Sequence, residues 1–348
     1  MVGTGELLGA QVMFFRRKPP APPSLTLEGA LGPNDRLDAA PAMAVTDPRA
    51  MCVVEGALLV SSGSDVLRYA TWDAAPRLVQ RLDAPVTALA ASPGGRVAVA
   101  VGDRLFMLTG DRAVEWPLQG VTGISDLVFL EEDEIAVVDT GYAPDQPILA
   151  LAPWDPVARG QVVAVRASGQ RQLVAGLHCP TGISLSDEGL AIAEMDRARI
   201  VDASGKVRQA GYPAHLGRLR KTARGYALAC LSRRDPLIEF LKTEPEFVRL
   251  MTTTIDPRHR IAPRDRPDFA HDLPITLGAT RLHGTIKPWA PSFSYGLVIL
   301  LDDALMPTGS AHSRANGQRH AICDVCDWNG DLIALSRASG EVLNLGAA

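Results

Sequence analysis

Long apolar runs are missing from this 348-residue sequence. No stretch approaches the roughly 18 consecutive apolar residues that a membrane-spanning helix needs, so we expect no transmembrane segment. A large excess of one charge is missing as well, because 35 Lys and Arg stand against 39 Asp and Glu, for a net charge of −4. This balance does not favour a nucleic acid as a partner. The hydrophobic and charged fractions, 47% and 21%, are those of a soluble globular protein.

The features of a signal peptide are also missing from the first residues. The apolar stretch Leu7–Phe15 precedes the basic residues Arg16–Lys18, whereas a signal peptide carries its charge first, and no small-residue cleavage site follows. The prolines between Pro19 and Pro23 then predict an extended spacer. We therefore interpret residues 1–26 as an arm, either disordered or packed on the domain. The alternative is a short anchor at a membrane surface.

Cysteines are few, and their number, five, is odd. Three of them lie within or beside apolar runs, which indicates buried, reduced thiols in a cytoplasmic protein. Cys323 and Cys326 form a CxxC motif, but neither a second CxxC motif nor a suitably spaced histidine pair completes a zinc site. The alternation in Ile322–Trp328 predicts a strand that would place these two cysteines on opposite faces. We predict no metal site.

Six short stretches of the chain resemble one another. Each begins with a turn and continues as an apolar strand, and the first four lie about 40 to 55 residues apart, a period typical of propeller blades. Apolar runs of this kind, bounded by Gly, Asp, Asn and Pro, are typical of strands. We therefore predict an all-β fold, a six-bladed β-propeller over residues 27–348. The six stretches are 55–63, 93–102, 132–141, 187–194, 223–230 and 329–336.

Two segments are longer than a turn between blade strands. Residues 142–159 contain four prolines, a density that a central strand does not tolerate, so we predict a loop on one face. Within residues 232–283, apolar residues at 237, 240, 241, 247, 250 and 251 have helical spacing, which Pro245 interrupts. This pattern predicts two short helices inserted in the propeller as a cap over one face.

Several phrases of the sequence, taken in order, resemble one known family. They are Leu27–Leu37, with Pro33-Asn34 inside it, then Pro180–Ser186, Ala193–Ile200, Gly211–Pro213, Leu237–Met251 and Lys287–Gly296. Together they are similar to the strictosidine synthase-like family of six-bladed propellers, and the resemblance covers nearly the whole chain from about Leu27. It implies a small-molecule site in the central channel, where the first strands of the blades converge.

Lactonases among the propellers related to this family hold a calcium ion in that channel. Their ligands are a Glu, two Asn and an Asp, one from each of four blades, and such oxygen ligands suit calcium. The resemblance places these positions at about Arg49, Ser125, Thr181 and Ala214, none of which carries a carboxylate. Asp126, beside Ser125, could substitute for one ligand only. Calcium is therefore disfavoured, and we predict no other cofactor.

The resemblance also implies a second chemistry, the condensation of an amine with an aldehyde. The catalytic glutamate of that reaction lies on the last blade, and counting back from the turn at Gly330 places Cys323 near its position. A thiol is a poor base toward an amine. Cys323 could act as a nucleophile only if its surroundings lowered its pKa, and the alternative is a buried thiol.

The remaining candidate residues each have a structural alternative. His215 follows a blade-start motif and could act as a general base; the alternative is a hydrogen-bonded structural histidine. Arg49 could bind a carboxylate or phosphate, or form a salt bridge at the rim. Arg314 could face an anionic ligand, or lie in a surface loop. Asp139 and Glu194 end equivalent apolar strands, where turn or inter-blade hydrogen bonds are expected rather than catalysis.

These observations leave three hypotheses for the function. The first is a propeller that binds a small molecule in its channel and hydrolyses an ester or lactone without the usual calcium. The second is a non-catalytic ligand-binding or scaffold propeller, and the third is a condensing enzyme. We predict His215 as the catalytic residue and the following as ligand-binding residues: Arg49, Ser125, Asp126, Thr181, Cys323 and Arg314.

Overall fold

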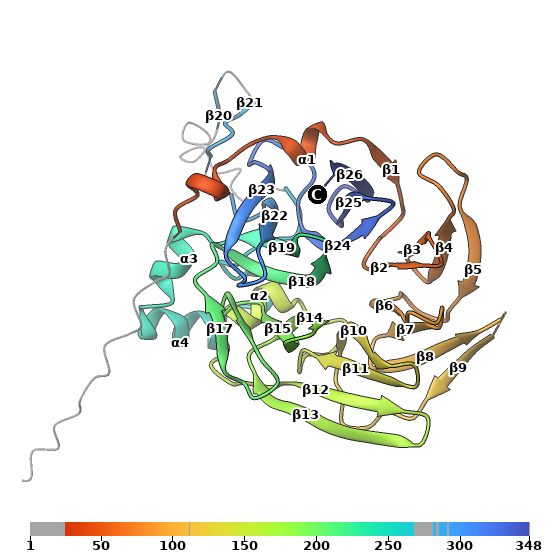
Figure 1. Ribbon diagram of the computed structural model, residues 1–348. Coiled ribbons are helices and arrows are strands. Elements are labelled where there is room, and N and C mark those ends of the chain that lie inside the picture. The colour runs from red at the N-terminus through yellow and green to blue at the C-terminus, as the bar shows by residue number, and fades with distance from the viewer. Residues whose placement is uncertain (1–24, 111, 268–280, 283–284, 291, 348) are drawn as a thin grey trace, which may run out of the picture.

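The protein is described by a computed structural model that covers residues 25–347 except 111, 268–280, 283, 284 and 291. Six four-stranded antiparallel sheets surround a central axis, which confirms the predicted all-β, six-bladed propeller (Figure 1). The first strands of the blades contact one another around this axis. We number the blades 1 to 6 in chain order.

The strands of each blade run from the axis to the rim, and their bounds are as follows. They are β2 (Met51–Val54), β3 (Ala57–Ser62), β4 (Asp65–Tyr69) and β5 (Arg77–Arg81) in blade 1; β6 (Ala88–Ala91), β7 (Val97–Val101), β8 (Arg104–Thr109) and β9 (Arg112–Trp116) in blade 2; β10 (Ile124–Glu131), β11 (Glu134–Asp139), β12 (Gly160–Arg166) and β13 (Gly169–Leu177) in blade 3; β14 (Pro180–Ser186), β15 (Gly189–Glu194), β16 (Arg199–Val201) and β17 (Val207–Ala210) in blade 4; β18 (Ala214–Thr222), β19 (Gly225–Arg233), β22 (Gly296–Leu301) and β23 (Pro307–Ser313) in blade 5; and β24 (Ile322–Trp328), β25 (Asp331–Ser336), β26 (Glu341–Ala347) and β1 (Ala42–Ala44) in blade 6.

Each of the six repeated sequence stretches forms the second strand of one blade. These strands are β3, β7, β11, β15, β19 and β25, and nearly all of their side chains are buried. A second strand has a neighbour on either side in its own sheet and a neighbouring blade over each face. Such strands are apolar almost throughout, because neither face meets water.

Blade 6 combines the two ends of the described chain. Its first three strands come from the C-terminal region, and its outer strand is β1, which pairs antiparallel with β26 from Ala42 opposite Leu343 to Ala44 opposite Glu341. The short elements η1 (Gly29–Leu31) and α1 (Arg36–Ala39) precede β1 and contact β23 of blade 5. This closure ties the N-terminal end of the described chain to the last blade and so closes the ring.

The predicted helical insertion lies between the second and third strands of blade 5. It contains α3 (Pro236–Leu241), α4 (Pro245–Thr254), η3 (Pro257–His259) and the hairpin β20 (Arg281–Leu282) and β21 (Thr285–Ile286). Asp235 caps α3 by accepting a 2.8 Å hydrogen bond from the Leu237 amide. Pro245 begins α4, where its missing N–H costs nothing, so the predicted interruption between two helices is confirmed. The insertion extends to Tyr295, beyond the predicted boundary at 283.

The proline-rich segment 142–159 connects the second and third strands of blade 3. The sequence predicted a loop there, and the structure shows two short helical turns within it, α2 (Ile148–Leu151) and η2 (Ala152–Trp154). Trp154 packs with Ile238 of α3 and Met251 of α4 in one apolar cluster. The proline-rich segment and the insertion therefore pack together.

One expectation about the CxxC motif is wrong. Cys323 and Cys326 belong to the same apolar cluster, not to opposite faces of β24. The reason is a β-bulge between Ile322 and Asp324, which inserts one extra residue and shifts the alternation of side chains by one position. All five cysteines are free.

The expected N-terminal arm, residues 1–26, lies almost entirely outside the described residues, and so does the membrane anchor considered for it. Within the part of the chain that the structure describes, no helix combines the length and apolar character needed to span a bilayer.

Two histidines near the end of blade 5, His312 and His320, are buried. His312 in β23 contacts the Tyr295 hydroxyl through Nδ1 at 3.1 Å and the Ser310 hydroxyl through Nε2 at 2.9 Å. Burial, with help from the positive charges of Arg314 and Arg233, lowers the pKa of His312 to about 4. The imidazole is therefore neutral in the folded protein at pH 7.

The depressed pKa of His312 predicts a loss of stability in acid. The unfolded chain protonates this histidine below about pH 6.5 and the folded protein only near pH 4, so the free energy of unfolding falls as the pH drops through that window. We expect the free energy of unfolding, measured in urea, to fall between pH 7 and pH 5 by about 2 kcal/mol more in the wild type than in His312→Gln. The exposed His259, changed to Gln, is the control and should behave as the wild type. Equal pH dependence in wild type and His312→Gln would contradict the assignment.

Candidate functional site

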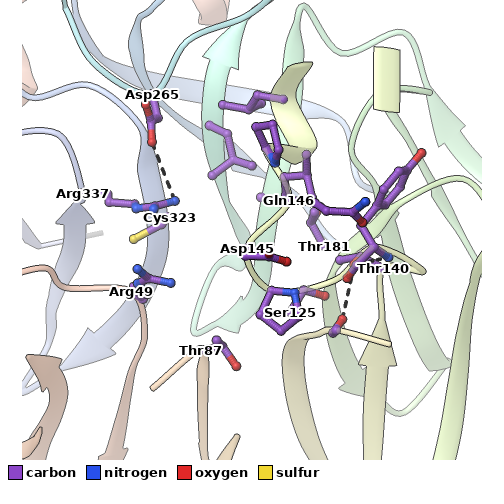
Figure 2. Close-up of a pocket in the computed structure, with 18 of the residues that line it drawn as sticks. Arg49, Thr87, Ser125, Thr140, Asp145, Gln146, Thr181, Asp265, Cys323 and Arg337 are labelled. Carbon is purple, nitrogen blue, oxygen red and sulfur yellow. Dashed lines mark hydrogen bonds and ion pairs between the residues drawn. The ribbon is translucent and has the colours of Figure 1, made fainter. Parts of the chain in front are cut away.

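A pocket of about 520 Å³ opens at one end of the propeller axis. Its base is formed where the first strands of the blades begin, and its walls include the proline-rich segment from Tyr142 to Ala150 and the insertion residues Pro263–Asp265. Figure 2 shows Arg49, Cys323 and Arg337 on one side and Asp145, Gln146 and Thr181 on the other. The two long segments that the sequence singled out thus form part of the pocket.

A β-bulge at the same place in four blades directs residues into this pocket. The pairing of the first two strands shifts at Ser125 in blade 3, Thr181 in blade 4, Gly217 and Arg218 in blade 5 and Cys323 in blade 6. All of these residues line the pocket. A bulge adds one residue to its strand and bends it, so that a side chain is turned out of the blade and toward the axis.

The guanidinium of Arg218 lies at the axis and joins the blades. It donates hydrogen bonds to main-chain carbonyl oxygens of four other blades, and the side chain is only 6% exposed. The four acceptors are the carbonyls of Arg49, Thr87 at 2.6 Å, Ser125 at 2.6 Å and Cys323 at 3.2 Å. Its Nε also donates to Asp126 at 3.1 Å. A planar guanidinium with five N–H donors suits such a ring of acceptors.

Two buried carboxylates and a second arginine complete this network. Asp126 and Asp324 are both fully buried, and Arg220 pairs with Asp126 at 2.7 Å and with Asp324 at 3.1 Å. Burial by itself would lower the pKa of Arg220, but the two carboxylates raise it above its usual value. Asp126 also accepts from the Ile183 amide of blade 4, at 2.9 Å. Through this bond and those of Arg218, the network reaches all six blades.

Gly182 allows the strand that carries Arg218 to approach blade 4. A Cβ atom at Gly182 would lie 2.6 Å from the Gly217 carbonyl oxygen and 2.7 Å from the Arg218 Cα. Both are backbone atoms, which cannot move aside as the end of a side chain can. The Gly182 position thus favours glycine because of close packing between two first strands.

The residues at the axis do not fit a calcium ion. Calcium takes six to eight oxygen ligands, and the oxygens gathered at the axis are four carbonyls and the carboxylates of Asp126 and Asp324, all of which already accept from Arg218. The guanidinium of Arg218 lies among these oxygens and bonds to both carboxylates, at 3.1 Å and 3.4 Å. A second cation in the same place would meet strong repulsion, so no chemical step is assigned to calcium here.

Four of the predicted ligand-binding residues line the pocket: Arg49, Ser125, Thr181 and Cys323. The hydroxyls of Ser125 and Thr181 each donate across to the next blade, to the carbonyls of Pro180 at 3.0 Å and Leu216 at 2.8 Å. Burial raises the pKa of Cys323 to about 12, so its thiol is protonated at neutral pH. This is the opposite of what a nucleophile needs.

The other predicted site residues lie elsewhere. Asp126 lies beneath the pocket in the ion-pair network. His215 is completely buried and does not line the pocket; burial, with the nearby charge of Arg234, lowers its pKa well below the usual value. Arg314 pairs with Asp35 at 2.8 Å outside the pocket. Ala214, expected in the channel, packs in the core between blades.

Asp139 and Glu194 make the structural hydrogen bonds expected of them. Asp139 accepts from the amides of Gly123 and Gly141, both at 2.9 Å, and so holds the start of its own blade. Glu194 accepts from the His178 amide at 2.6 Å and pairs with Arg199. Both carboxylates thus organise connections between strands.

Sequence reasoning missed Arg218 because it placed the channel position of blade 5 too early in the strand. The signal was present in a pattern of four consecutive residues, in which an apolar residue is followed by a small residue, a charged residue and a second apolar residue. It occurs as Ile124–Leu127, Leu216–Leu219 and Ile322–Val325, and it places Arg218 level with Asp126 and Asp324. Arg337 and Asp265 had no such signal, because they lie in turns whose positions depend on the fold.

Solved structures similar to this one confirm the fold. A gluconolactonase from Xanthomonas campestris is 12% identical with a TM-score of 0.52, covering 93% of this chain and 95% of that one. A luciferin-regenerating enzyme is 10% identical with a TM-score of 0.51, over 86% and 91%. An aldose sugar dehydrogenase from Streptomyces coelicolor, solved with PQQ, is 10% identical with a TM-score of 0.51, over 88% and 95%.

These similarities establish a propeller architecture and no more, because identities near 10% accompany different activities on one scaffold. No family model matches the sequence, and no curated protein matches it. The strictosidine synthase-like assignment is therefore not confirmed. The chain is a six-bladed β-propeller with structural neighbours that include gluconolactonases.

Replacing Arg218 should destabilise the propeller strongly. Arg218→Met leaves Asp126 and Asp324 buried with one cation instead of two and removes the hydrogen-bond donors to four carbonyls. We expect the free energy of unfolding in urea to fall by about 3–5 kcal/mol. Arg49→Met is the control, because the Arg49 side chain is partly exposed and forms an ion pair with the exposed Asp47. Loss of this pair should lower the free energy of unfolding by no more than about 1 kcal/mol. A loss for Arg218→Met no larger than that of the control would contradict the role assigned to the axial guanidinium.

Proposed function

We propose that this propeller binds a small organic anion in its central pocket, without a metal ion. The observation that carries the proposal is the charge of the pocket lining. Among the described residues that line it, four are arginines and two are aspartates. Arg218 is neutralised in the axial network, and Arg264 donates to the carbonyls of Arg258 and Arg260. Arg49 and Arg337 are left at the pocket wall with guanidinium donors for a ligand.

The partners of these two arginines compete weakly for them. Arg49 pairs with Asp47 at 3.1 Å, and Arg337 lies 3.8 Å from Asp265. Both aspartates are about two-fifths exposed, so water screens these ion pairs. A carboxylate or phosphate that enters the pocket could be held by either guanidinium through paired hydrogen bonds. The hydroxyls of Ser125 and Thr181 on the other side would serve uncharged parts of the ligand.

Hydrolysis of an ester or lactone is the second candidate function. It is favoured by Asp145 and Gln146, which Figure 2 shows across the pocket from Arg49. In such a reaction, the Asp145 carboxylate would be the general base for a water molecule, and Arg49 would stabilise the charge that develops on the carbonyl oxygen. His215 has no part in this scheme, because it lies outside the pocket. The gluconolactonases among the structural neighbours make a lactone the first substrate class to test.

Support for the condensing reaction is lacking in the described pocket. That chemistry needs a carboxylate base in the pocket near the position of Cys323, and the group that lines the pocket there is a protonated thiol. The neighbouring carboxylate, Asp324, does not line the pocket and is paired with Arg218 and Arg220. A cytoplasmic location remains a prediction from the sequence.

Anion binding can be tested with a panel of sugar acids, hydroxy acids and organic phosphates. We expect at least one of them to raise the melting temperature and to bind with a 1:1 stoichiometry in calorimetry. Arg49→Met and Arg337→Met should each weaken that binding about 10- to 100-fold, because a hydrogen bond to a charged group contributes roughly 1.5–3 kcal/mol. Arg104→Met is the matched control, since Arg104, at the start of β8, pairs with the exposed Asp83 and does not line the pocket. Unchanged affinity in both pocket variants, or no response to any anion, would refute the proposal.

The hydrolase candidate is tested separately. Glucono-δ-lactone and simple aliphatic lactones should be hydrolysed faster than the spontaneous rate in a pH-stat assay, and this excess should withstand chelation of divalent ions. Asp145→Asn should lower kcat by about 100-fold or more, as expected for the loss of a general base. If wild type and Asp145→Asn both give only the spontaneous rate, the protein binds its ligand without transforming it.

A further inference from the structure

A second cluster of charged side chains, separate from the central pocket, joins the insertion to the blades. It contains Asp196, between β15 and β16 of blade 4; His215, in the first strand of blade 5; and Glu239, in α3. One ligand atom from each residue lies within 4.8 Å of those of the other two, and all three residues are buried. None of them lines the pocket at the axis.

His215 is the unusual member of this cluster. Its side chain is completely buried, yet neither ring nitrogen has a hydrogen-bond partner among the described residues. Nδ1 points toward Asp196, with 3.6 Å to the nearer carboxylate oxygen. A buried polar atom without a partner costs free energy, so a group that binds it is expected. A neutral imidazole is also the form that binds a metal ion.

A cation already lies between the two carboxylates. The ammonium of Lys242 is 2.5 Å from Asp196 Oδ1 and 3.0 Å from Glu239 Oε1. The second oxygen of Glu239 accepts from Arg234 at 2.6 Å. Asp196 Oδ1 is also the oxygen nearest His215 Nδ1, so Lys242 neutralises an oxygen that faces the imidazole. Because Lys242 is 17% exposed and has a long flexible stem, its ammonium can turn to solvent and leave these oxygens to another cation.

We propose that Asp196, His215 and Glu239 form a binding site for a divalent transition metal ion such as Zn²⁺, in competition with the Lys242 ammonium. One imidazole nitrogen and two carboxylate oxygens are a suitable ligand set for such an ion. Two ligands about 2.1 Å from a tetrahedral ion lie roughly 3.4 Å apart, close to the 3.6 Å between His215 and Asp196. The bound ion ties α3 of the insertion to blades 4 and 5. Arg234 keeps its bond to the second oxygen of Glu239 and orients that ligand.

The test uses the full chain, freed of metal ions with a chelator. Calorimetry then measures the binding of Zn²⁺, and absorption spectroscopy measures the binding of Co²⁺. Lys242→Met removes the competing ammonium, so we expect one Zn²⁺ per chain bound at least tenfold more tightly than in the wild type. The visible Co²⁺ spectrum of this variant should have the intensity of a four-coordinate site. Zn²⁺ should also raise the melting temperature of the variant.

His215→Leu in the Lys242→Met background should abolish the stoichiometric binding while leaving the metal-free protein folded, since the imidazole has no hydrogen bond to lose in the described structure. His215→Asn in the same background is the second variant, in case the larger apolar side chain does not pack.

His178→Gln is the control, because this histidine contacts Arg197 and lies outside the cluster; it should leave binding unchanged. Absence of stoichiometric binding in Lys242→Met, or retention of it in both His215 variants, would overturn the proposal and leave Lys242 as a permanent ion-pair partner. These outcomes are independent of anion binding at the central pocket.

Discussion

The rest of the structure depends on one buried guanidinium, that of Arg218. The first strands of the six blades meet at the axis, and four of the blades direct a carbonyl oxygen to it. Such a ring of acceptors needs a cation or donor at its centre. Arg218 supplies both, since it bonds to carbonyls of four other blades and to two buried carboxylates. Arg220 balances the remaining negative charge. The two arginines and two aspartates form a network that is neutral overall, which makes burial of four charges tolerable.

The same interaction sets the chemistry of the pocket. Because a side chain of the protein is the axial cation, the pocket base carries no open coordination position. The polar groups that a ligand can meet are then side chains of the pocket wall, which include guanidiniums, hydroxyls and the Asp145 carboxylate. The walls come from the proline-rich segment of blade 3 and from the insertion in blade 5. These two segments share the apolar cluster around Trp154, so the shape of the pocket depends on how the insertion packs. The cluster of Asp196, His215 and Glu239 joins that insertion to the blades at a second point.

Much of the fold could be predicted from the sequence, because the signals that define it are local. The six apolar stretches, the prolines that exclude strand structure and the helical spacing on either side of Pro245 depend on neighbours along the chain. The closure of blade 6 by β1 could not be predicted in this way, since a three-residue strand pairs with a partner about 300 residues away. Within the site, the resemblance to a propeller family indicated Ser125, Thr181 and Cys323, whereas a bulge at each of them decided where their side chains point.

By itself, then, the sequence determined the repeat, the number of blades, the two long connecting segments and the lack of carboxylates at the positions expected for calcium. Only the tertiary structure decided that Arg218 reaches the axis, that His215 lies beneath the insertion and not in the pocket, and that Arg337 faces the pocket beside Arg49. The physical reason is that strand periodicity is a property of adjacent residues, while an ion pair requires side chains from different blades to meet. Contacts between blades depend on bulges, close glycine contacts and ring closure, which bring together residues that are distant in the sequence.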